Sequence, residues 1–111
     1  KYAVVGGGDT NSASGHTSTL LGGADNISSG AASTLGGGSS NTSSGNWSYL
    51  GGGLDNTASG SQSTVSGGAN NTASGDHATV IGGGYDDDRE ALARRHAIVV
   101  EASYEFATRS L

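Results

Sequence analysis

The sequence contains no cysteine and almost no basic residues, and both absences exclude kinds of function. Without cysteine the chain can form neither disulfides nor thiolate metal sites. No Lys or Arg lies between Lys1 and Arg89, and the net charge is −5. Because no basic stripe can neutralise phosphates, we expect no binding to nucleic acid. No apolar run reaches the length of a membrane span or a signal peptide, so we expect no membrane contact within this segment.

Large apolar side chains are scarce as well. The 111 residues include 21 glycines but one Trp and one Phe, and 32% of them are hydrophobic. A monomeric domain of this length usually needs a dense apolar core to offset the entropy of ordering its chain. A composition rich in Gly and Ser is otherwise typical of disorder. Order is expected here only because the residues recur with a strict period.

A 15-residue repeat runs through most of the chain. Its motif, Asn-x-(Ala/Ser)-Ser-Gly, begins at Asn11, Asn26, Asn41, Asn56 and Asn71. Five residues after each closing glycine comes an aliphatic residue, and a pair of glycines starts two positions after it. The aliphatic column consists of Val5, Leu20, Leu35, Leu50, Val65 and Val80.

This unit predicts a β-solenoid. Each copy holds a β-prone triplet such as Ser63-Thr64-Val65 between Gly-rich turns. A helix is excluded because each glycine would cost it about 1 kcal/mol relative to alanine. Two short strands and two turns fit in 15 residues, and identical strands spaced by one coil would stack about 4.7–4.9 Å apart and satisfy each other's backbone groups. We therefore expect an all-β protein, a parallel β-roll or β-solenoid of 15-residue coils, over residues 1–85.

The repeated positions suggest structural roles. We expect the Asn column (Asn11, Asn26, Asn41, Asn56 and Asn71) to form a ladder of side-chain amides, each bonded to its neighbour along the axis. The glycine that closes each motif is expected to supply a turn with positive φ. The Leu/Val column is the only aliphatic column present in every coil, which is thin for a free-standing core. We therefore expect Val5, Leu20, Leu35, Leu50, Val65 and Val80 to face partner chains and form a shared core.

These residues resemble the head repeats of trimeric autotransporter adhesins, the haemagglutinin-like left-handed parallel β-roll family. The similarity is carried by Ala13-Ser14-Gly15 and by residues 58–65 and 73–80, and phage tail fibres contain similar arrays. The resemblance implies an intertwined or side-by-side homotrimer that is extracellular, on a bacterial cell surface or a virion. Two departures, the period of 15 and the prominent Gly-Gly pair, leave open whether the roll is of the adhesin type.

The C-terminal segment, residues 86–111, breaks the period. In one interpretation Asp87 caps a short helix, with Glu90 as its capping-box partner. In the other a degenerate coil continues with four extra residues, because residues 77–81 match residues 96–100. We favour an irregular insertion followed by a degenerate terminal coil, since solenoids need atypical repeats to cover their ends.

Catalytic and metal-binding patterns are missing from the sequence. It has no Gly-x-Ser-x-Gly elbow, no phosphate loop and no His-Glu-x-x-His pair, so we expect no enzyme and no cofactor. His16, His77 and His96 do not recur in every coil, which argues against a stacked metal site. The run Asp86–Asp88 is better explained as a solvated loop than as a calcium site, because the repetitive calcium motif is missing.

One coil carries candidate binding residues. The two positions after each Ser-Gly corner vary most, and in the third complete unit they are Asn46 and Trp47. Tyr49 replaces the Thr of neighbouring coils, and strand alternation would place both rings on one face. The pair beside Asn46 is suited to stack on a sugar ring or a host protein. Alternatively, the rings pack between subunits or cover the corner.

The function predicted first is a non-enzymatic extracellular fibre or adhesin segment that attaches to a host surface, glycan or matrix. The second is a phage or virion tail fibre for host recognition. A lower alternative is an ice-binding β-solenoid, since Thr19, Thr34, Thr64 and Thr79 form a column, although only Thr17 lies two residues before it. A polysaccharide-acting β-helix enzyme is disfavoured because the repeats lack paired carboxylates.

Overall fold

A computed structural model describes residues 2–82, 92–93 and 98–99, and these residues form strands and turns but no helix. Each strand is two residues long, as expected where a short coil must turn several times. The strands are β1 (Val4–Val5), β2 (Ser12–Ala13), β3 (Thr19–Leu20), β4 (Ile27–Ser28), β5 (Thr34–Leu35), β6 (Thr42–Ser43), β7 (Tyr49–Leu50), β8 (Thr57–Ala58), β9 (Thr64–Val65), β10 (Thr72–Ala73), β11 (Thr79–Val80), β12 (Leu92–Ala93) and β13 (Ile98–Val99). None of the described residues lies in a helix that could cross a membrane.

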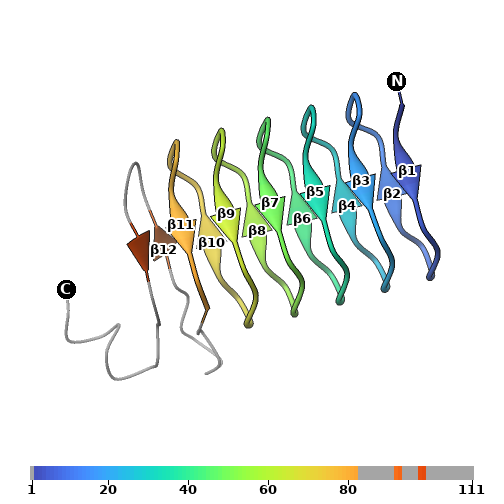
Figure 1. Cartoon of the computed structure of the whole chain (residues 1–111). Helices are drawn as coiled ribbons and strands as arrows, with labels where there is room; N and C mark the ends of the chain where they lie inside the picture. Colours follow the sequence, from blue (N-terminus) through green and yellow to red (C-terminus); the bar gives the residue numbers. More distant parts are fainter. Residues whose placement is uncertain (1, 83–91, 94–97, 100–111) are drawn as a thin grey trace.

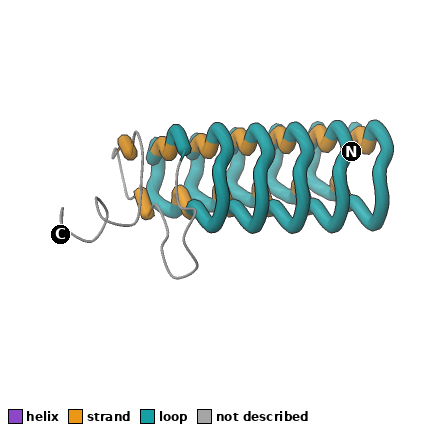
Figure 2. Tube along the Cα trace, turned by 90° about the horizontal axis from the view of Figure 1, so that it is seen from below, coloured by secondary structure: helices purple, strands orange, loops and turns teal. Residues whose placement is uncertain are grey.

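The strands form two parallel sheets, and each coil contributes one strand to each sheet (Figure 1). The first sheet has the order β1-β3-β5-β7-β9-β11-β13, and the second has the order β12-β10-β8-β6-β4-β2. Through the regular part, every pairing joins equivalent positions of successive repeats, such as Thr34 with Tyr49. Figure 2 shows the coils following one another along a single axis. The predicted all-β solenoid with 15-residue coils is therefore confirmed.

The corners between the sheets contain two left-handed positions in each coil. The φ angles at these non-glycine residues lie between 51° and 62°. One set is Thr10, Asp25, Ser40, Asp55 and Asn70, and the other is Thr17, Ala32, Trp47, Gln62 and His77. The prediction that the motif-closing glycine supplies this turn is wrong, because the left-handed residue lies two positions after it. Gly30 is required for another reason: a Cβ there would collide with the carbonyl oxygen of Gly45 in the next coil.

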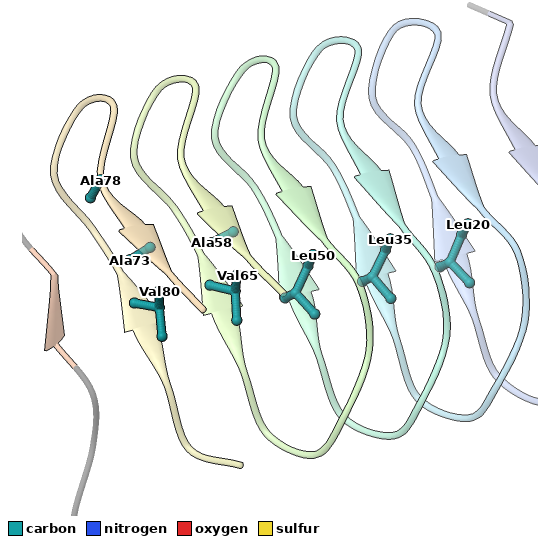
Figure 3. Packing of buried hydrophobic residues seen from close by; sticks show 8 residues of the cluster. All are labelled: Leu20, Leu35, Leu50, Ala58, Val65, Ala73, Ala78 and Val80. Carbon is teal, nitrogen blue, oxygen red and sulfur yellow. The ribbon is translucent and has the colours of Figure 1, made fainter. Parts of the chain in front are cut away.

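The Leu/Val column fills the interior of its own chain (Figure 3). Leu20, Leu35, Leu50, Val65 and Val80 are fully buried and pack with small residues such as Ala58 and Ala73. The prediction that this column forms a core shared with partner chains is therefore wrong. A flattened coil has a narrow interior, so one large side chain beside Ala and Ser is enough to fill it. Val5 belongs to the same column but is 46% exposed, because β1 pairs with a neighbour on one side only among the described strands.

The repeat continues into the C-terminal segment. Thr79 and Val80 pair with Ile98 and Val99, which confirms the predicted alignment with four extra residues in this coil. On the second sheet, β10 pairs with β12 in the same parallel sense. The helix predicted at Asp87–Glu90, the Asp86–Asp88 run and His96 lie outside the described residues.

Candidate functional site

The Asn column is buried and connects adjacent coils by hydrogen bonds, so it is not a surface for ligands. The amide Nδ2 of Asn41 donates hydrogen bonds to the carbonyl oxygens of Gly37 and Gly53, both at 2.9 Å. Its Oδ1 accepts the backbone N–H of Asn56 at 2.8 Å. Each amide thus bonds backbone groups of its own and the next coil, and not the neighbouring amide as predicted. Buried polar groups need hydrogen-bond partners, and the Asn amides supply them at the Gly corner.

The same arrangement recurs through the solenoid. Asn26, Asn56 and Asn71 are fully buried like Asn41, and each Nδ2 donates to the glycine carbonyl four residues before it. The Asn column therefore fixes the height of one coil above the next. These four side chains have no exposed atoms to offer a partner.

The predicted binding residues, in contrast, lie on the surface. Trp47 is 64% exposed and Tyr49 is 47% exposed. Trp47 occupies a left-handed corner and not strand β7, so the alternation that predicted a common face for the two rings does not extend to it. Both rings are nevertheless accessible and only two residues apart in the chain. The Tyr49 hydroxyl lies 3.5 Å from the position that a Cβ would take on Gly51, so the side chain points toward Gly51 of its own coil.

Backbone hydrogen bonds hold this corner in place. The N–H of Trp47 donates to the carbonyl of Ala31 at 2.8 Å, and Asn46 Oδ1 accepts the N–H of Ala31 at 3.0 Å. Two contacts to a single residue of the preceding coil give the corner a defined conformation. Trp47 therefore projects from an ordered base, which favours a preformed contact site over a flexible one.

Charged groups of the described residues are scattered along the surface. Asp9, Asp25, Asp55 and Asp76 are exposed, as are His16 and His77. Thr10 Oγ1 donates a hydrogen bond to Asp25 Oδ1 at 2.5 Å, so the Asp25 carboxylate links the equivalent corners of two successive coils. Within residues 2–82, 92–93 and 98–99, no three His, Asp or Glu side chains gather where they could hold a metal ion.

The second sheet carries an ordered surface that the sequence reasoning missed. Its inward column holds Ser28, Ser43, Ala58 and Ala73, all fully buried. Alternation places the residues on either side of this column outward, and these are nearly all Thr or Ser. The signal was present in the motif Asn-Thr-Ala-Ser-Gly, where a hydroxyl residue stands on each side of the inward Ala.

No family model, curated protein or solved structure matches the chain.

Proposed function

We propose that this chain is a non-enzymatic, rigid segment of an extracellular fibre on a bacterial cell surface, which attaches that surface to a host glycan, protein or matrix. One observation carries the proposal: the inward positions of the solenoid repeat, whereas the exposed corner positions vary. The same solenoid would serve equally in a phage or virion tail fibre that recognises a host, which is the second kind of protein that the resemblance implies.

The constant positions are the ones that hold the coils together. The buried Asn and Leu/Val columns recur in every complete unit, and their contacts join one coil to the next. In a solenoid, stability is a sum of repeat terms and nearest-neighbour terms. Residues that contribute to neither term are free to differ from coil to coil.

The variable positions lie at one corner of each coil, where they are half-buried or exposed. They are His16–Thr17, Ala31–Ala32, Asn46–Trp47, Ser61–Gln62 and Asp76–His77. This division separates the residues that specify the fold from the residues available for recognition. It is the arrangement expected of a scaffold that presents different side chains on one backbone.

Trp47 and Tyr49 are the proposed contact residues, with Asn46 beside them. An exposed aromatic ring offers a flat apolar face on which the C–H face of a sugar ring can stack. Asn46 uses its Oδ1 within the chain, and its Nδ2 is suited to donate to a sugar hydroxyl. A glycan is therefore the ligand class that best fits this corner.

The homotrimer remains part of the proposal but needs a different interface from the one the sequence suggested. Large apolar side chains are exposed on the outer side of the first sheet and directly after its strands, where they are available for contact between copies: Val4, Leu21, Tyr49 and Ile81. A glycan and a second copy would compete for Tyr49. Light scattering during gel filtration separates these cases, since a homotrimer elutes at three times the chain mass.

The test of glycan attachment is binding to a panel of immobilised glycans by the native chain and by Trp47→Ala. Gln62→Ala is the matched control, because Gln62 occupies the equivalent corner of the next coil with the same φ of 59°. Alanine is tolerated at this corner, as Ala32 shows. We expect Trp47→Ala to lose most binding and Gln62→Ala to retain it. Equal binding by all three proteins would overturn the assignment of the contact site.

A further inference from the structure

Outward side chains in the strands of the second sheet and directly after them form a regular array of hydroxyl groups. One column holds Ser12, Ile27, Thr42, Thr57 and Thr72, and the other holds Ser14, Ser29, Ser44, Ser59 and Ser74. We call these two columns together the hydroxyl face. All its members except Ile27 carry a hydroxyl group, and each is exposed or half-buried.

The backbone fixes the spacing of the hydroxyl face in two directions. Along the axis, Ile27 pairs with Thr42 and Thr42 with Thr57, so neighbouring members of a column lie about 4.8 Å apart. Within a coil, Ser59 directly follows strand β8 and stands two residues after Thr57, so an extended backbone between them separates the columns by about 6.6 Å. The ladder continues through the Ser column, where the N–H of Ser29 donates to the carbonyl of Ser43 at 3.0 Å.

The hydroxyls of this face are not used inside the protein. Side-chain hydrogen bonds of the described Ser and Thr residues are made by interior serines and by Thr10 and Thr17 at corners. Threonine is also stiff at χ1, because its Cβ carries two heavy atoms. A stack of Thr side chains in one register therefore presents its hydroxyl and methyl groups in a repeated orientation.

The hydroxyl face bears no charge. No Lys or Arg lies between residues 2 and 82, and the Asp and His residues of this stretch occupy other positions of the coil. A charged side chain would hold a hydration shell that resists removal. A regular, neutral array of donors and acceptors instead complements a partner that is itself neutral and crystalline and consists of hydrogen-bonding groups.

We infer that the hydroxyl face binds ice. The oxygen atoms on an ice surface form a neutral lattice of donors and acceptors whose repeat distances are of the same few-ångström scale as the two spacings of this face. The Thr methyl groups add apolar area that gains from contact with an ordered surface. The activity is separate from the proposed attachment function, because it uses the second sheet and leaves the Trp47 corner free.

The first sheet does not offer an equivalent array. Its outward Thr column is interrupted by Tyr49, and the column two residues further along contains Leu21, Gly36 and Gly51. Thr17, the one threonine two residues before Thr19, occupies a left-handed corner and is not part of the sheet. The column pair that an ice-binding surface requires is therefore found on the second sheet.

The experiment measures thermal hysteresis and partitioning of the chain into a growing ice hemisphere, with ice in dilute buffer as the probe. Thr57→Tyr places a large ring in the middle of the hydroxyl face. Thr64→Tyr is the matched control, since Thr64 is outward and half-buried in the same coil and its column already accommodates Tyr49. We expect the native chain and Thr64→Tyr to show hysteresis and enter the ice, and Thr57→Tyr to lose most of both activities.

Circular dichroism and thermal unfolding establish that each variant is folded. Thr57→Ile serves if Thr57→Tyr does not fold, because Ile27 occupies the same column, and it should reduce hysteresis by removing the central hydroxyl. Absence of hysteresis and of ice partitioning in the native chain overturns the inference. So does greater loss in Thr64→Tyr than in Thr57→Tyr. An inactive species at a multiple of the chain mass overturns it equally, because the proposed contact between copies uses the first sheet and leaves the hydroxyl face exposed.

Discussion

The hydroxyl oxygens of Ser28 and Ser33 lie 2.8 Å apart inside the coil and form a buried hydrogen bond between the two sides of the solenoid. Ser43 and Ser48 form the same pair in the next coil, at 2.7 Å. Each pair joins an inward residue of the second sheet to the residue that precedes a strand of the first sheet. A polar pair can therefore occupy this interior when both partners are present.

The other coils show what happens when one partner is missing. Ala13 and Ala58 take the place of the first serine, and the hydroxyls of Ser18 and Ser63 are buried without a hydrogen-bond partner. In the last regular coil both positions are alanine, at Ala73 and Ala78. The interior thus contains matched polar pairs, a matched apolar pair and two mismatched pairs, and the mismatches are sites of avoidable instability.

Ser63→Ala is expected to stabilise the protein. A buried hydroxyl without a partner costs about 1–3 kcal/mol, and Ala78 shows that alanine fits this position. We expect the free energy of unfolding to rise by about 1 kcal/mol, measured by urea denaturation. Ser33→Ala is the control, because it leaves the Ser28 hydroxyl unpaired and should lower the free energy of unfolding. Equal destabilisation by both substitutions would contradict the account of matched pairs.

Leu35→Ala is expected to lower the free energy of unfolding by about 2–5 kcal/mol, because it opens a cavity in the closed interior. Thr34→Ala, at the outward neighbour in the same strand, should change it by less than about 0.5 kcal/mol. Denaturation at several protein concentrations distinguishes an internal residue from an interface residue. A loss that depends on concentration would place Leu35 at a contact between subunits.

Asn41→Ala is expected to destabilise the solenoid strongly. The substitution removes two donor contacts to glycine carbonyls and one acceptor for the N–H of Asn56, all in a buried region. A cost above about 3 kcal/mol follows from leaving several of these groups unpaired. Asn46→Ala, which removes one bond at the exposed corner, should cost about 1 kcal/mol. Comparable thermal shifts for the two variants would mean that the Asn column contributes no more than a surface bond.

Two glycines in neighbouring corners are expected to respond in opposite ways to alanine. A Cβ at Gly30 would meet the carbonyl oxygen of Gly45, so Gly30→Ala must push two coils apart. A Cβ at Gly22 would meet no atom within 4 Å. Gly22→Ala should therefore be neutral or raise the free energy of unfolding by about 0.4–1 kcal/mol, by restricting the unfolded chain. Thermal unfolding monitored by circular dichroism measures both, and a destabilised Gly22→Ala variant would argue against the open space at this position.

Much of the fold could be derived from the sequence because the period is strict. The constant spacing of the Asn motifs predicts a 15-residue coil, and the pairing of Thr34 with Tyr49 confirms it. The match of residues 77–81 with 96–100 predicted the pairing of Thr79 with Ile98 across a longer step. In both cases the register follows from local similarity along the chain, which requires no knowledge of the interior.

The sequence by itself determined the repeat length, the parallel stacking and the residues that share a column, because identical units placed one above another must align identical side chains. Only the tertiary structure decided which side of each strand is enclosed. Alternation separates Thr34 from Leu35 but does not state how wide the space behind Leu35 is. The flattened coil makes that space narrow, so the Leu/Val side chains fill the interior of a single chain. The Thr and Ser residues on the outer side of the second sheet remain on the surface.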